Sequence, residues 1–145
     1  MSFAGLVDLL RGAPAEGTFD VIPYARTLGL RYRRIGDGIE VLMPFAAPLV
    51  GAPQRLHGGT VAGLLEIASI AQIIRALPDD DAAPVVKPIS VTVDYLRAAA
   101  CETTYAAAVI TRMGRRIANV RAEAWQADRA QPVAASHMNV MLARD

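Results

Sequence analysis

The segment from residue 58 to residue 77 constrains the fold more than any other stretch of the chain. It reads GGTVAGLLEIASIAQIIRAL, and its apolar residues occupy most directions around a helix. Its polar residues recur at multiples of three, so they drift round the helix by about 60° per step of three. They therefore form no single solvent-facing stripe, and a helix that is apolar nearly all round is a buried one. We expect a long central helix covered by other elements.

Strand patterns flank this helix on both sides. Before it, two alternating runs separated by GDG predict a hairpin within residues 29–45. After it, consecutive runs joined by short turns predict strands that pair antiparallel. The fold class is therefore α+β, with an antiparallel sheet of five to six strands wrapped round the central helix. The expected elements are a short helix at 2–11, a turn-rich link at 13–17, an irregular loop at 46–55, and strands at 87–98, 103–113, 116–127 and 132–143.

One of these strands explains how a helix could lie so close to the sheet. On the strand at 116–127, one face carries Ala118, Val120, Ala122 and Ala124. Small side chains let another backbone approach closely, so this face suits a strand that packs under the helix.

Length and composition exclude several classes of protein. The 145 residues suit one domain, taken here as 1–145. A net charge of +1 gives no field that would attract nucleic acid or an anionic membrane. The longest nearly apolar run contains Glu66 and Arg75, which disfavours a membrane span, and Cys101 alone allows no internal disulfide. The N-terminus lacks a signal-peptide pattern, so we expect a soluble cytoplasmic protein.

Glu66 stands out because it lies near the middle of the apolar helix. Charged side chains are almost never fully buried without a partner. Either the helix is only half covered, with Glu66 facing solvent or an arginine, or removal from water tunes the carboxylate for nucleophilic or general-base chemistry.

Two glycines, Gly58 and Gly59, open the same helix. A helix N-terminus presents unpaired N–H groups and a positive dipole end, and glycine leaves them open to a ligand or an oxyanion. The glycines could also merely permit the turn into the helix. Gly58 and Glu66 are about 12 Å apart along the axis, whereas reacting groups must come within roughly 3 Å. If they act together, they come from two subunits related by a two-fold axis.

The motifs as a group resemble a known family. LHGGTVAGLLEIA, VTVDYLRAA and GRRIANVRAEAW together are similar to the hotdog-fold acyl-CoA thioesterases, closest to the PaaI-like (phenylacetate-degradation) branch. The resemblance spans about residues 29–143. Its pattern of His-Gly-Gly, six residues and an acid is matched by His57, Gly58, Gly59 and Glu66, its YLR-A element by residues 95–98, and its Gly-Arg turn by residues 114–115.

The resemblance implies the hotdog fold and hydrolysis of an acyl-CoA thioester by a homodimer or homotetramer. Glu66 would be the nucleophile or general base, and the N–H of Gly58 from the partner subunit would polarise the thioester carbonyl. Gly59 would keep the approach open, and His57 would shape the site or position the thioester. The family implies no metal and no redox cofactor, with coenzyme A entering as part of the substrate.

This chain departs from the family at positions that orient water or substrate. Gly51 stands where relatives often carry Asn or Gln. Either Gln54 takes that role and binds substrate from a reshaped loop, or the role is absent and turnover is slow. For the hydroxyl that holds the water we favour Ser90, with Ser69 and Thr92 as alternatives. A last group, Arg115 and Arg116, could bind the CoA phosphates as forked donors or could be ordinary solvated turn residues.

Gly51 also keeps a rival function open, a non-catalytic acyl-CoA or lipid-binding hotdog domain. A hotdog hydratase is a third possibility, but the sequence shows no catalytic histidine paired with an acid.

Overall fold

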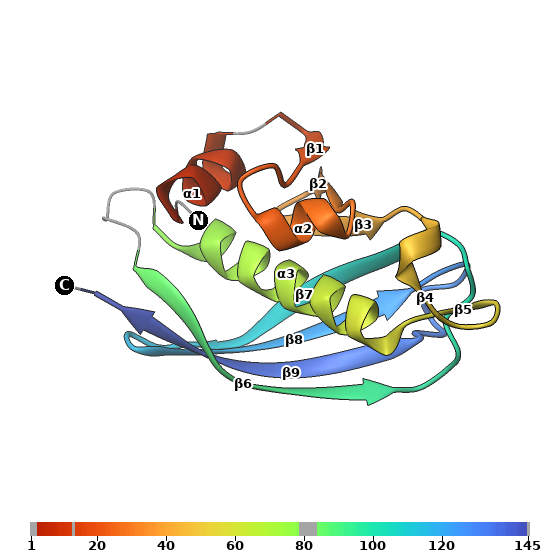
Figure 1. Ribbon diagram of the computed structural model, residues 1–145. Helices are drawn as coiled ribbons and strands as arrows, with labels where there is room; N and C mark the ends of the chain where they lie inside the picture. The colour runs from red at the N-terminus through yellow and green to blue at the C-terminus, as the bar shows by residue number, and fades with distance from the viewer. Residues whose placement is uncertain (1–2, 13, 79–83, 145) are drawn as a thin grey trace.

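The computed structural model describes residues 3–12, 14–78 and 84–144. The N-terminal end of the expected helix at 2–11 and part of the break after the central helix lie outside the described residues. Figure 1 shows the elements in chain order, which are α1 (Phe3–Gly12), β1 (Glu16–Thr18), α2 (Pro23–Thr27), β2 (Arg31–Ile35), β3 (Gly38–Met43), β4 (Val50–Ala52), β5 (Arg55–Leu56), α3 (Gly58–Ala76), β6 (Val85–Tyr95), β7 (Thr104–Met113), β8 (Ile117–Trp125) and β9 (Ala134–Ala143).

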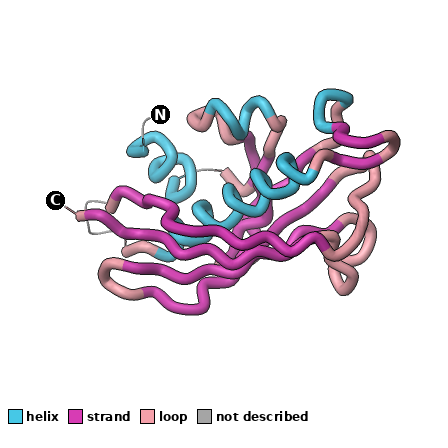
Figure 2. Tube along the Cα trace, turned by 60° about the horizontal axis from the view of Figure 1, so that its bottom comes forward, coloured by secondary structure: helices cyan, strands magenta, loops and turns pink. Residues whose placement is uncertain are grey.

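The main sheet has seven strands in the order β1-β2-β3-β7-β8-β9-β6, and each neighbouring pair is antiparallel. The long helix α3 lies along one face of this sheet, with α1 and α2 beside it on the same side (Figures 1 and 2). This is the predicted hotdog arrangement. It has one strand more than the largest predicted number, because β1 forms from residues predicted to be a turn-rich link and pairs with β2.

The core lies between α3 and the sheet. Ten residues of α3 are buried, and the alanine face predicted on β8 is buried beneath the helix layer, with Ala118, Val120, Ala122 and Ala124 all at most 2% exposed. Burial is not uniform round α3. The stripe formed by Gly59, Ala62, Glu66 and Ile70 remains partly or fully exposed, so the prediction of a helix covered nearly all round is wrong on that side.

Among the described residues, α3 is the one helix long and apolar enough to cross a membrane, and 56% of its most apolar window is buried inside the domain. That burial is typical of a core helix that packs on its own sheet.

The segment predicted as an irregular loop, 46–55, contains regular structure. A 3₁₀ turn at Ala47–Leu49 leads into the short hairpin of β4 and β5. The sequence also did not reveal α2, because five residues beginning with proline give too short a pattern for a helical period. The remaining strands agree with the prediction to within a few residues at their ends.

Strand β6 is at the edge of the sheet and is exposed along most of its length. Its pairing with β9 assigns its residues to two faces. Lys87, Ser90, Thr92 and Asp94 are opposite β9 residues that face away from α3, whereas Val91, Val93 and Tyr95 are opposite β9 residues of the core face. The core-facing residues Val91 and Tyr95 are nevertheless 46% and 58% exposed, since α3 does not extend over this edge.

Candidate functional site

The N-terminus of α3 is fixed by His57. His57 is the N-cap residue, with φ −65° and ψ 131°, and its Nδ1 accepts a hydrogen bond from the N–H of Gly59 at 2.8 Å. A Cβ atom on Gly59 would lie only 2.9 Å from that Nδ1. Glycine at residue 59 therefore leaves room for the His57 ring in this position, and His57 acts locally as a cap that satisfies one of the free N–H groups.

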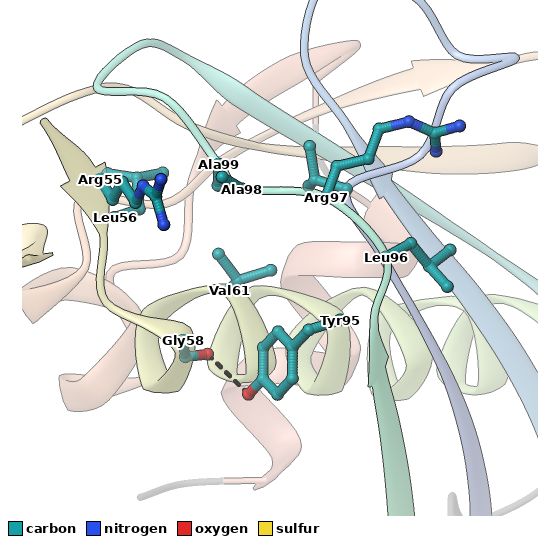
Figure 3. A pocket seen from close by; sticks show the side chains of 10 residues that line it. Arg55, Leu56, Gly58, Val61, Tyr95, Leu96, Arg97, Ala98 and Ala99 are labelled. Atoms are coloured by element: carbon teal, nitrogen blue, oxygen red, sulfur yellow. Dashed lines mark hydrogen bonds between the residues drawn. The ribbon is translucent and has the colours of Figure 1, made fainter.

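Gly58 contacts the edge strand. The hydroxyl of Tyr95 donates to the carbonyl of Gly58 at 3.0 Å, and a Cβ on Gly58 would lie 3.2 Å from the Tyr95 ring (Figure 3). The N–H of Gly58 has no hydrogen-bond acceptor among the described residues. It is therefore a free donor at the positive end of the helix dipole.

A pocket of about 390 Å³ opens beside Gly58, between the start of α3, β5 and the segment after β6 (Figure 3). The pocket is lined by two arginines, Arg55 and Arg97, to which the sequence assigned no binding role. Arg97 also donates to the carbonyl of Pro132 at 2.8 Å, and in Figure 3 its guanidinium points away from Gly58. Arg97 belongs to the YLR-A element, and that motif was the signal that could have identified it.

Glu66 lies in a second pocket, of about 440 Å³, between α1, α2, α3 and β6. Its side chain is partly buried, and it has no hydrogen-bond or ion-pair partner among the described residues. The interpretation that the helix is only half covered is therefore right about exposure, although no arginine in the described part of the chain pairs with the Glu66 carboxylate. Apart from Glu66, the lining consists of Leu6, Ile22, Pro23, Tyr24, Gly63, Ile67, Ile70, Val86 and Pro88.

The two pockets share no lining residue. Both pockets are lined in part by α3, and Gly58 and Glu66 are about 12 Å apart along its axis at 1.5 Å per residue. One chain therefore does not bring the free N–H and the carboxylate onto the same small group.

Gly51 has a steric reason to be glycine. A Cβ at this position would lie 2.7 Å from the Cα of His57, so an Asn or Gln side chain does not fit without moving the backbone. Gln54 does not replace it in this chain. It is an exposed residue with φ 63° in the turn between β4 and β5, and it lines neither pocket.

The prediction that Ser90 holds a water beside Glu66 is corrected by the sheet geometry. Ser90 faces away from α3, and its Oγ accepts a hydrogen bond from Asn139 at 3.0 Å. Thr92 lies on the same outer face. The remaining alternative, Ser69, is fully buried and donates to the carbonyl of Leu65 at 2.8 Å, the bond within the helix that its spacing allows.

Arg115 and Arg116 lie at the opposite end of the sheet from Gly58. The strand residues next to their turn are level with Lys87, near the start of β6. The β6 residue that contacts Gly58 is Tyr95, at the other end of the same strand. Eight strand residues separate these positions, which is about 26 Å at 3.3 Å per residue. These arginines therefore do not join the pocket at Gly58 within one chain. They line a separate pocket of about 500 Å³ with Met141, Leu142, Ala143 and Arg144.

Metal ligands were not predicted from the sequence. In residues 3–12, 14–78 and 84–144, no group of three or more His, Cys, Asp or Glu side chains is placed to hold a metal ion.

Comparison with known structures identifies the same fold in several bacterial proteins. A Chromobacterium violaceum protein is 28% identical, with 98% of each chain covered and a TM-score of 0.77. A Ralstonia eutropha protein, assigned as a candidate thioesterase and as related to phenylacetic acid degradation, is 21% identical over 94% of this chain and 98% of its own, with a TM-score of 0.74. A Bacillus halodurans protein crystallised with CoA is 20% identical over 88% and 82%, with a TM-score of 0.76.

No curated protein sequence matches the chain. The family model of the thioesterase superfamily does match, over residues 54–133. This range is more than half of the chain and includes all of α3, with Gly58 and Glu66. The family predicted from the sequence is thus confirmed, and membership supports thioester hydrolysis in general terms. The chain belongs to the thioesterase superfamily.

Proposed function

We propose that this protein hydrolyses an acyl-CoA thioester to the free acid and CoA. The observation that carries the proposal is the unpaired carboxylate of Glu66 in an otherwise apolar pocket, on the same helix whose first N–H, that of Gly58, is unused. A carboxylate can activate a nucleophile and a free N–H can stabilise an oxyanion, which are the two tasks of acyl transfer.

The two pockets suit the two ends of such a substrate. The pocket at Glu66 is lined by apolar side chains and would take the acyl group. The pocket at Gly58 carries Arg55 and Arg97 at its margin and would take the CoA side, whose phosphates match guanidinium groups. The Bacillus halodurans protein of the same fold was crystallised with CoA, which supports a CoA-bearing substrate in general.

In the proposed reaction the thioester carbonyl accepts a hydrogen bond from the Gly58 N–H. Glu66 either removes a proton from the attacking water or attacks the carbonyl carbon itself, forming an anhydride that water then cleaves. In both routes the C–S bond breaks, and the CoA thiolate leaves and is protonated. The chemistry requires no metal or redox cofactor, and CoA enters only as part of the substrate.

We further propose that the active site is shared between two copies of the chain. Because Gly58 and Glu66 of one chain are about 12 Å apart, the Gly58 of one copy would act with the Glu66 of the other. The exposed edge strand β6 and the exposed stripe of α3 are the surfaces that we propose to meet the second copy. We propose a cytoplasmic homodimer or homotetramer.

A non-catalytic acyl-CoA or lipid-binding domain is the second candidate. One observation favours it. Gly51 cannot carry an amide in this backbone, and Ser90 faces the other side of the sheet, so neither residue can orient a water at Glu66.

The test is a panel of acyl-CoAs of increasing chain length with detection of the free thiol, run on wild type and Glu66→Gln. The variant keeps the shape of the side chain and removes the base. Turnover should fall by about a hundredfold or more, as is usual on loss of a catalytic base or nucleophile. Glu102→Gln is the matched control, because Glu102 is exposed and lines neither pocket.

Equal turnover in Glu66→Gln and wild type would refute the mechanism. Binding of acyl-CoA by the wild type, measured calorimetrically, without any release of thiol would favour the binding domain instead.

A further inference from the structure

The two peptide groups on either side of the Gly58 Cα are each held by a side-chain hydroxyl. The hydroxyl of Thr60 donates to the carbonyl of His57 at 2.6 Å, and the hydroxyl of Tyr95 donates to the carbonyl of Gly58 at 3.0 Å. Thr60 belongs to the first turn of α3. Tyr95 is the last residue of β6, and Figure 3 shows its hydroxyl next to the Gly58 carbonyl. Two separate elements therefore converge on one residue.

The peptide group that contains the free N–H is strongly hydrogen bonded at its other end. The carbonyl of His57 accepts from the Thr60 hydroxyl, from the Thr60 N–H at 3.0 Å and from the Val61 N–H at 3.4 Å. Hydrogen bonds to a carbonyl polarise its peptide and strengthen the N–H of the same peptide as a donor. That N–H belongs to Gly58, and it is the one without an acceptor among the described residues.

The following peptide group, between Gly58 and Gly59, is fixed at both ends. Its carbonyl accepts from Tyr95, and its N–H donates to Nδ1 of His57. The Tyr95 ring also lies where a Cβ of Gly58 would be only 3.2 Å away. Consecutive glycines are conformationally free in an unrestrained chain, so these contacts, together with the helix itself, fix where the Gly58 N–H points.

We propose that Thr60 and Tyr95 are positioning residues, whose hydroxyls orient and polarise the Gly58 N–H for the oxyanion. The inference rests on the proposed function, because it requires the Gly58 N–H to contact the reacting carbonyl. Its physical basis is that a donor already fixed in place needs no reorganisation when charge develops in the transition state.

The test uses Thr60→Val and Tyr95→Phe, each of which removes one hydroxyl and keeps the overall side-chain shape. Each variant should lower kcat by about tenfold, less than loss of the donor itself would, and should leave KM within about twofold. A residue that merely supported substrate binding would change KM instead.

The matched controls remove similar hydroxyls elsewhere. Thr27→Val loses a hydroxyl that donates to the carbonyl of Pro23 at 3.2 Å in α2. Tyr105→Phe loses a tyrosine hydroxyl on the face of the sheet opposite α3, where the ring stacks on Trp125. Both controls should keep the wild-type kcat.

A second measurement needs no activity and separates this inference from the proposed function. In the free protein, amide hydrogen exchange of Gly59 should become about tenfold faster in Tyr95→Phe, because its peptide loses the carbonyl anchor. The ¹⁵N resonance of Gly58 should shift in Thr60→Val. If wild type hydrolyses thioesters and both variants keep its kcat, the inference is overturned while the proposed function stands. If wild type hydrolyses none, the proposed function fails, and unchanged amide signals in both variants would overturn the inference as well.

Discussion

The two pockets along α3 differ in nearly every chemical property. The pocket at Gly58 combines a free backbone N–H, a tyrosine hydroxyl and two arginines, Arg55 and Arg97. The pocket at Glu66 is lined by apolar side chains around a single unpaired carboxylate. The difference teaches that, under the proposed mechanism, one helix carries both halves of a catalytic site without completing either. The group proposed to bind the thioester carbonyl is at its N-terminal end, and the proposed base is about two turns further on.

Loss of the donor in the first pocket should have the largest effect. Gly58→Pro removes the N–H, and proline is well tolerated at the first position of a helix after an extended residue such as His57. We expect kcat to fall by roughly 10²–10³-fold, as on removal of an oxyanion donor.

Gly58→Ala is the control for this prediction, since it keeps the N–H and adds the Cβ that approaches the Tyr95 ring. If alanine and proline reduced kcat equally, steric conflict with Tyr95 would explain the loss, and the role of the N–H in the first pocket would be refuted.

A smaller effect is expected in the second pocket, where Tyr24 forms part of the wall. Tyr24 is 50% exposed, and its ring lies 2.9 Å from where a Cβ of Gly63 would be. Tyr24→Ala enlarges the space beside Glu66. The ratio of kcat/KM for longer over shorter straight-chain acyl-CoAs should therefore rise by about tenfold. That factor is within the usual effect of one or two methylene contacts on kcat/KM.

Tyr24→Phe should keep the wild-type chain-length preference, because the ring remains. An unchanged ratio in Tyr24→Ala would mean that the acyl group does not enter the pocket at Glu66, and the contrast between the two pockets would need another explanation.

Much of this architecture follows from local sequence patterns. The apolar helix, the hairpin before it and the four strands after it each show a period that burial imposes on the chain. The spacing of the family motif alone also selects Gly58 and Glu66 as candidate site residues. In contrast, β1 and α2 are short, and their formation depends on contacts with β2 and α3, which no local period records.

The supporting residues of the site could not be predicted in the same way. Ser90 carries a hydroxyl near the start of a strand, which makes it a candidate from the sequence. Strand register, however, decides which face a side chain occupies, and a shift of one residue reverses that face. Pairing with β9 directs Ser90 away from α3. The roles of Tyr95 and Gly51 similarly depend on which elements meet in space, namely β6 with the start of α3, and β4 with His57.

The central claim is that the two halves of the site come from different subunits. The most direct measurement is the activity of purified heterodimers that contain one Gly58→Pro chain and one Glu66→Gln chain, each carrying a different affinity tag. If the site is shared, each heterodimer contains one site with both groups intact and should recover about half of the wild-type activity. If both groups served the same site from one chain, neither site would be intact, and heterodimers no more active than the parent variants would contradict the account.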